Sequence, residues 1–118
     1  MVADIHKGSN LYGALAYNQD KIDNGKGQIL ETNRVFVPHD GQFRVSDCVR
    51  DFEQAMPSQI KTGKPVIHIS LNPHPDDRLT DTQLADISRE YLEKIGFGGQ
   101  PYMIFKHEDI DRQHVHII

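Results

Sequence analysis

The sequence has few of the features that would place it outside the cell or in a membrane. Its single cysteine, Cys48, cannot form an internal disulfide, and its apolar neighbours indicate that it is buried as a small apolar group. No apolar run approaches the roughly 20 residues needed to cross a bilayer. The first eight residues carry Asp4, His6 and Lys7 instead of the basic stretch and apolar core of a signal peptide. We therefore expect a cytoplasmic protein without membrane insertion.

The sequence also lacks an excess of basic residues. Its 13 Lys and Arg residues against 17 Asp and Glu residues give a formal net charge of −4 at pH 7. Phosphate contacts favour a basic surface, so this balance argues against a nucleic acid as the partner. Two considerations weaken that argument: a bound divalent metal ion would add positive charge that the formal count omits, and several acidic residues cluster near histidines where they could serve such an ion.

The pattern of apolar residues predicts one domain with alternating strands and helices. A chain of 118 residues has room for a single core. Runs rich in β-formers predict strands at residues 2–5, 30–37, 66–71, 102–107 and 114–118. Apolar residues at helical spacing predict helices at residues 10–20, 46–56 and 81–95. Ser9 is the expected N-cap of the first helix, and Thr80 with Gln83 forms a capping box for the third. This order favours an α+β fold, a two-layer sandwich in which helices pack against a largely antiparallel central sheet.

Three of the seven histidines fall within the last twelve residues. His114 and His116 must project from the same face of their strand, because side chains alternate along it. If the last two strands form a hairpin, His107 ends the preceding strand close to His114, and three imidazoles can converge. Three nitrogen ligands that leave the other coordination positions of the metal open are typical of a catalytic metal site. The alternative is that all three are surface histidines of a two-sided strand.

Other polar residues near these histidines have two interpretations each. Asp109 and Asp111 lie in the predicted hairpin loop, where a carboxylate could accept the free ring N–H of a ligating histidine, or simply be solvated. His68 and Ser70 lie on the polar face of their strand, where they could bind a phosphate or occupy a plain surface position. We expect His6 to be a surface residue.

Three segments together resemble the relaxase or mobilisation-nuclease family of conjugative and mobilisable plasmids and transposons. The terminal block HEDIDRQHVHII, residues 107–118, is similar to the family's metal motif of an upstream histidine followed by His-hydrophobic-His. VIHISLNP, residues 66–73, resembles the family's middle motif, and LAYNQD, residues 15–20, places Tyr17 where the tyrosine motif is expected. The resemblance runs through the whole chain. One departure is Gln113, which stands where many members have proline.

The resemblance implies a reaction and the groups that carry it. A divalent metal ion, Mg²⁺ or Mn²⁺, would be held by the three terminal histidines, and Tyr17 would attack single-stranded DNA at the origin of transfer to leave a 5′-phosphotyrosyl strand and a free 3′-hydroxyl. Tyr12 is the alternative nucleophile. Accessory relaxosome proteins are the expected partners. The chain ends at Ile118 inside an apolar strand, so we expect residues 1–118 to be a relaxase catalytic core truncated at its C-terminus.

Two other functions are compatible with the same residues. A metal-dependent phosphoester hydrolase could use the three histidines with bound water in place of a tyrosine, and the negative net charge suits it slightly better. A non-catalytic DNA-binding or relaxosome-assembly module could use a metal only to stabilise the hairpin. Formation of phosphotyrosyl DNA separates the relaxase from both.

Overall fold

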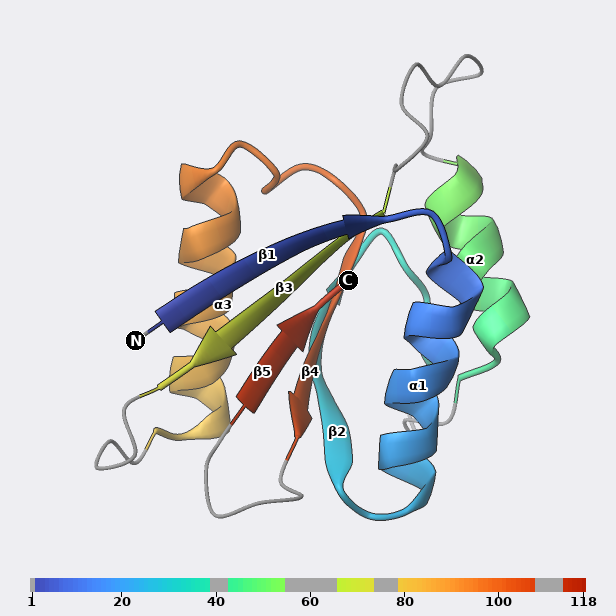
Figure 1. The fold of residues 1–118 in the computed structure, drawn as a ribbon, viewed down its shortest axis with the longest axis horizontal. Helices are drawn as coiled ribbons and strands as arrows, with labels where there is room; N and C mark the ends of the chain where they lie inside the picture. Colours follow the sequence, from blue (N-terminus) through green and yellow to red (C-terminus); the bar gives the residue numbers. More distant parts are fainter. Residues whose placement is uncertain (1, 39–42, 55–65, 74–78, 108–113) are drawn as a thin grey trace.

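The computed structural model describes residues 2–38, 43–54, 66–73, 79–107 and 114–118 (Figure 1). The elements in chain order are β1 (Val2–Gly8), α1 (Leu11–Asp23), β2 (Gly27–Asn33), α2 (Val45–Gln54), β3 (Val66–Asn72), α3 (Asp81–Lys94), β4 (Tyr102–His107) and β5 (His114–Ile117). The described strands form one sheet in the order β1-β3-β5-β4-β2, and every neighbouring pair is antiparallel. The predicted α+β fold with an antiparallel central sheet is confirmed, and the strand that carries His114 and His116 lies in its centre.

Helices cover both faces of the sheet. Side chains alternate along β4, so Met103 and Phe105 pack against α1 and α2, whereas Tyr102 and Ile104 pack against α3. Figure 1 shows α3 on one side of the sheet and α1 with α2 on the other. The two layers expected from the sequence therefore become three, because all six residues of β4 are buried and each face of this strand needs a cover.

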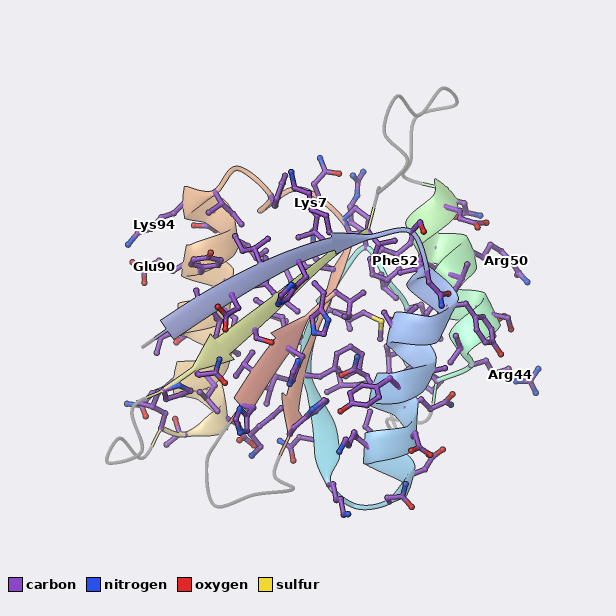
Figure 2. The ribbon with its side chains drawn as sticks, viewed as in Figure 1. Lys7, Arg44, Arg50, Phe52, Glu90 and Lys94 are labelled. Carbon is purple, nitrogen blue, oxygen red and sulfur yellow. The ribbon has the colours of Figure 1, made fainter. Side chains whose placement is uncertain are left out.

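The orientation of individual side chains agrees with this layering. In Figure 2, Phe52 lies on the side of α2 that faces the sheet, while Arg44 and Arg50 point away from it. Glu90 and Lys94 point outward from α3, where they form an ion pair of 3.3 Å. The capping box of α3 predicted at Thr80 is present in full. No helix in the described ranges is long and apolar enough to cross a membrane.

Several boundaries differ from the sequence prediction, and β1 and α1 each end three residues later than predicted, at Gly8 and Asp23. The N-cap of α1 is Asn10, whose side chain accepts a hydrogen bond from the Gly13 N–H, instead of Ser9. The strand predicted at residues 30–37 begins earlier and ends at Asn33, because Arg34 has a φ of 59° and cannot continue an extended strand. The β-formers that follow pack from an irregular segment, in which Val35 is buried in the core. The predicted end of the second helix, Met56, lies outside the described residues.

Candidate active site

The three terminal histidines lie on one face of the sheet. His107 is directly opposite His114 in the β4–β5 pair, and directly opposite residues of antiparallel strands project to the same face. His116 shares that face because it lies two residues after His114. The intervening Val115 and the following Ile117 are each 1% exposed and pack on the α3 side. The register therefore agrees with the face that strand alternation predicts for all three imidazoles.

His107 is buried and is held by an asparagine of α1. Its Nε2 lies 2.7 Å from Oδ1 of Asn18, and the Nδ2 of Asn18 donates to the carbonyl of Ala14 one turn earlier, at 2.8 Å. An amide oxygen can only accept, so the ring of His107 donates through Nε2–H and keeps its lone pair on Nδ1. His107 is 3% exposed, and no part of Asn18 is exposed.

His114 is held in the same way by the end of β3. Its Nδ1 lies 2.7 Å from Oδ1 of Asn72. The amide oxygen assigns the proton to Nδ1 and leaves the lone pair on Nε2. That Nε2 atom is buried and has no hydrogen-bond partner among the described residues. A buried polar atom without a partner marks a position that a ligand could satisfy.

His116 connects the terminal histidines to β3. Its Nδ1 lies 2.9 Å from Nε2 of His68 and 3.4 Å from Oγ of Ser70. Its ring also lies against that of His107, with centroids 4.1 Å apart and planes inclined by 30°. Burial lowers the pKa of His68, and the nearby charge of His6 lowers it further, so His68 is neutral at pH 7 and suits a hydrogen bond between two imidazoles. His6 is exposed, as expected.

Tyr17 of α1 lies beside this cluster of histidines. The ring of Tyr17 is 53% exposed, and its centroid lies 6.0 Å from that of His107. The Nζ atom of Lys21, one turn later in α1, lies 5.5 Å from the centre of the Tyr17 ring. Tyr12 is 59% exposed and, being five residues earlier, is rotated by about 140° around the helix. Of these two tyrosines, only Tyr17 has a ring contact with a histidine among the described residues, with the two planes inclined by 54°.

The donor set suits a divalent metal ion, although the side chains do not form a finished metal site. In the described part of the chain, no group of three or more His, Cys, Asp and Glu side chains stands so that it could hold an ion. One nitrogen of His116 faces His68 instead. In His107 and His114, nevertheless, one ring nitrogen is bonded to an asparagine oxygen and the other is left as a possible ligand, an arrangement typical of metal-binding histidines. In His114 that second nitrogen, Nε2, is buried and has no hydrogen-bond partner among the described residues. Asp109 and Asp111 lie outside the described residues.

A comparison with protein families identifies the chain. The family model described as "Relaxase: MobA/VirD2-like, nuclease domain" matches residues 17–118, a range that contains Tyr17 and all three terminal histidines. The chain belongs to this relaxase family. Its function is therefore that of a relaxase nuclease domain, which nicks DNA. Comparisons with curated proteins and with solved structures gave no match.

Sequence reasoning missed the two asparagines that hold the histidines of this relaxase domain. Asn18 follows Leu11 and Leu15 at intervals of four and three residues, so it lies on the apolar stripe of α1. A polar side chain on such a stripe must find a hydrogen-bond partner, which is the signal that could have singled it out. Asn72 shares its strand parity with Ser70, so it projects to the same face of β3. The partner of each asparagine could not be inferred, because the two contacts join residues 89 and 42 positions apart.

Proposed function

We propose that this relaxase domain makes a strand-specific nick in single-stranded DNA at an origin of transfer, with Tyr17 as the nucleophile. The phenolic oxygen loses its proton to solvent and forms a bond to phosphorus. The bond from phosphorus to the 3′ oxygen breaks, and that oxygen takes up a proton and leaves as a 3′-hydroxyl. The product is a 5′-phosphotyrosyl strand, whose phosphodiester conserves the bond for rejoining. The observation that carries this proposal is the position of the half-exposed Tyr17 ring, 6.0 Å from the ring of buried His107.

Lys21 supports Tyr17 over Tyr12 as the nucleophile. Its ammonium group lies on the same side of α1 as the Tyr17 ring, 5.5 Å from the ring centre. The positive charge of Lys21 attracts the phosphate that is to be attacked. This local positive charge also offsets the net charge of −4, which is unfavourable for binding DNA.

We propose that His107, His114 and His116 bind a divalent ion, Mg²⁺ or Mn²⁺. When bound there, such an ion would polarise the scissile phosphate and stabilise charge on its oxygens. Asn18 and Asn72 already accept the ring N–H of two of these histidines. For Asp109 and Asp111 we keep the predicted role of accepting the free ring N–H of a ligating histidine.

His68 and Ser70 are proposed to contact the phosphate backbone from the same face. Both polar groups lie within hydrogen-bonding reach of His116, so a phosphate drawn to the histidines would also meet them. For this reaction we also propose accessory relaxosome proteins as partners and a cytoplasmic location. We propose residues 1–118 as the catalytic core for it.

A labelled substrate tests this function directly. The protein is incubated with Mn²⁺ and 3′-end-labelled single-stranded DNA from the origin of transfer of the element that carries the gene, and the label is followed on a denaturing gel. We expect the label to move with the protein, and Tyr17→Phe to abolish this adduct while Tyr12→Phe keeps it. Cleavage without an adduct would indicate the metal-dependent hydrolase instead. Binding without cleavage would indicate the non-catalytic DNA-binding module.

A further inference from the structure

Asn18 has a buried side-chain amide whose nitrogen and oxygen both form hydrogen bonds. Its Nδ2 donates to the carbonyl of Ala14 within α1, and its Oδ1 accepts from Nε2 of His107 in β4. No part of Asn18 is exposed. If the amide were turned over, its oxygen would face the carbonyl oxygen of Ala14 and two acceptors would meet without a proton between them. The helix therefore fixes the direction of the amide, and the amide fixes the proton of His107.

The ring of His107 has little freedom to avoid this contact. Gly27 of β2 is paired with His107, and a Cβ built on Gly27 would lie 3.4 Å from Cδ2 of the ring. On another side, the ring of His116 lies with its centroid 4.1 Å away. A ring packed in this way keeps the orientation that its hydrogen bond selects.

Asn18 is also the residue next to Tyr17 in the chain. Consecutive residues on a helix point about 100° apart, so Tyr17 is half exposed while Asn18 is directed into the core. The bond from Asn18 to His107 thus joins the helix that carries the proposed nucleophile to the strand that carries a proposed metal ligand. Its length of 2.7 Å is that of a well-formed hydrogen bond.

We propose that Asn18 is a positioning residue that holds His107 as the Nε2–H tautomer, so that Nδ1 is the nitrogen presented to a metal ion. This inference rests on the proposed function for the identity of His107 as a ligand. The tautomer itself does not depend on that function and can be measured on the metal-free protein. Because Asn18 is fully buried and bonded to His107, its proposed effect on the site is exerted through His107.

Nitrogen NMR on the metal-free wild-type chain tests the tautomer. At about pH 8, above the usual pKa of histidine, a long-range proton–nitrogen correlation distinguishes the protonated from the unprotonated ring nitrogen. The signals of His107 are assigned by their loss in His107→Gln. We expect the proton on Nε2. A proton on Nδ1 would overturn the proposal, whether or not the protein nicks DNA.

Two substitutions at Asn18 test its effect on metal binding. Asn18→Leu keeps the branched four-atom outline of the side chain but has no acceptor, and loss of such an orienting partner typically weakens metal affinity about 10- to 100-fold. Asn18→Asp keeps an acceptor for Nε2–H but places its second oxygen against the carbonyl of Ala14, so we expect lower stability with the tautomer retained. We expect it to bind Mn²⁺ within about threefold of wild type, which is less than the loss typical of a missing orienting partner. Titration calorimetry with Mn²⁺ alone gives both affinities.

Ser88→Ala is the matched control. Ser88 is fully buried in α3 and donates to the carbonyl of Leu84 four residues earlier, as Asn18 does to Ala14, but it lies on the opposite face of the sheet. We expect Ser88→Ala to lower stability without changing the His107 tautomer or the Mn²⁺ affinity. Equal Mn²⁺ affinity in wild type and Asn18→Leu would overturn the positioning role. If Asn18→Leu does not fold, the wild-type tautomer and the Asn18→Asp affinity decide, and loss of either expected result contradicts the proposal.

Discussion

A methyl group added at Gly27 would crowd the buried side of the site, while the same change at Gly8 would not. A Cβ on Gly27 would lie 3.2 Å from the carbonyl oxygen of Lys106, 3.3 Å from Cβ of Lys21 and 3.4 Å from Cδ2 of His107. The two shorter distances require the neighbours to move by a few tenths of an ångström, and the third is at the limit of ordinary van der Waals contact. A Cβ on Gly8, in β1, has no heavy atom within 4 Å. Neither glycine has a positive φ, so the backbone allows alanine at both positions.

The two substitutions should therefore change stability in opposite directions. Replacing glycine by alanine restricts the unfolded chain and stabilises by about 0.4–1 kcal/mol where the native site is open. Overpacking a tight site costs about 1–3 kcal/mol. We expect Gly8→Ala to gain about 0.5 kcal/mol and Gly27→Ala to lose about 1 kcal/mol, which corresponds to roughly 4 °C in Tm for the second variant.

Urea unfolding and nicking assays on both variants check this reasoning. Because the carbonyl of Lys106 must shift and the ring of the next residue, His107, is also in contact, we expect Gly27→Ala also to slow nicking of origin DNA. Gly8→Ala should nick at the wild-type rate. Equal stability of the two variants would show that the β2–β4 contact is looser than described. Full nicking by a destabilised Gly27→Ala would show that a small displacement of His107 is harmless, which contradicts the role given to its orientation.

Three further predictions concern the rest of the domain. The hydrogen bond from Lys106 lowers the pKa of Asp81, so the stabilisation it gives is present at pH 7 and is lost as the pH falls below about 4 through the folded-state pKa. Because the Asp81 carboxylate is half exposed, this contribution is limited to about 1 kcal/mol. The difference in urea midpoint between wild type and Asp81→Asn should shrink over that pH range, and a constant difference would contradict the prediction. Burial, with a smaller effect of Asp51, raises the pKa of the Cys48 thiol to about 11, so a thiol reagent at about pH 8 should label it only after unfolding, and rapid native-state labelling would refute its burial. Leu15→Ala should cost about 2–5 kcal/mol in urea unfolding because the side chain of Leu15, on the inner face of α1, is fully buried in the core. A cost below about 1 kcal/mol would show that this core is poorly packed.

The fold was largely accessible from local sequence signals. The capping box at Thr80 and the alternation in residues 114–117 depend only on neighbouring residues, and both were predicted correctly. The second strand was misplaced because Val35 looks like a strand former but packs from an irregular segment after Arg34 turns the chain. Propensity does not reveal such a turn, since a positive φ at arginine is set by the surrounding tertiary structure.

The site was accessible only in part. Strand period alone places His114 and His116 on one face, and that placement agrees with the observed register. The approach of Tyr17 to His107 and the hydrogen bond from His107 to Asn18 depend on how α1 crosses β4, which joins residues about ninety positions apart. No local pattern encodes that crossing. The ligand role of the three histidines stays a prediction.

The central claim is that Tyr17 itself becomes linked to DNA, and mass spectrometry of the reaction product tests it most directly. The protein is incubated with Mn²⁺ and origin DNA, the DNA is digested by nucleases, and trypsin releases the peptide of residues 8–21, which contains both Tyr12 and Tyr17. Fragmentation between the two tyrosines locates the nucleotide remnant. We predict a 5′-linked nucleotide on Tyr17 and an unmodified Tyr12. A remnant on Tyr12, or cleaved DNA with both tyrosines unmodified, would contradict the account.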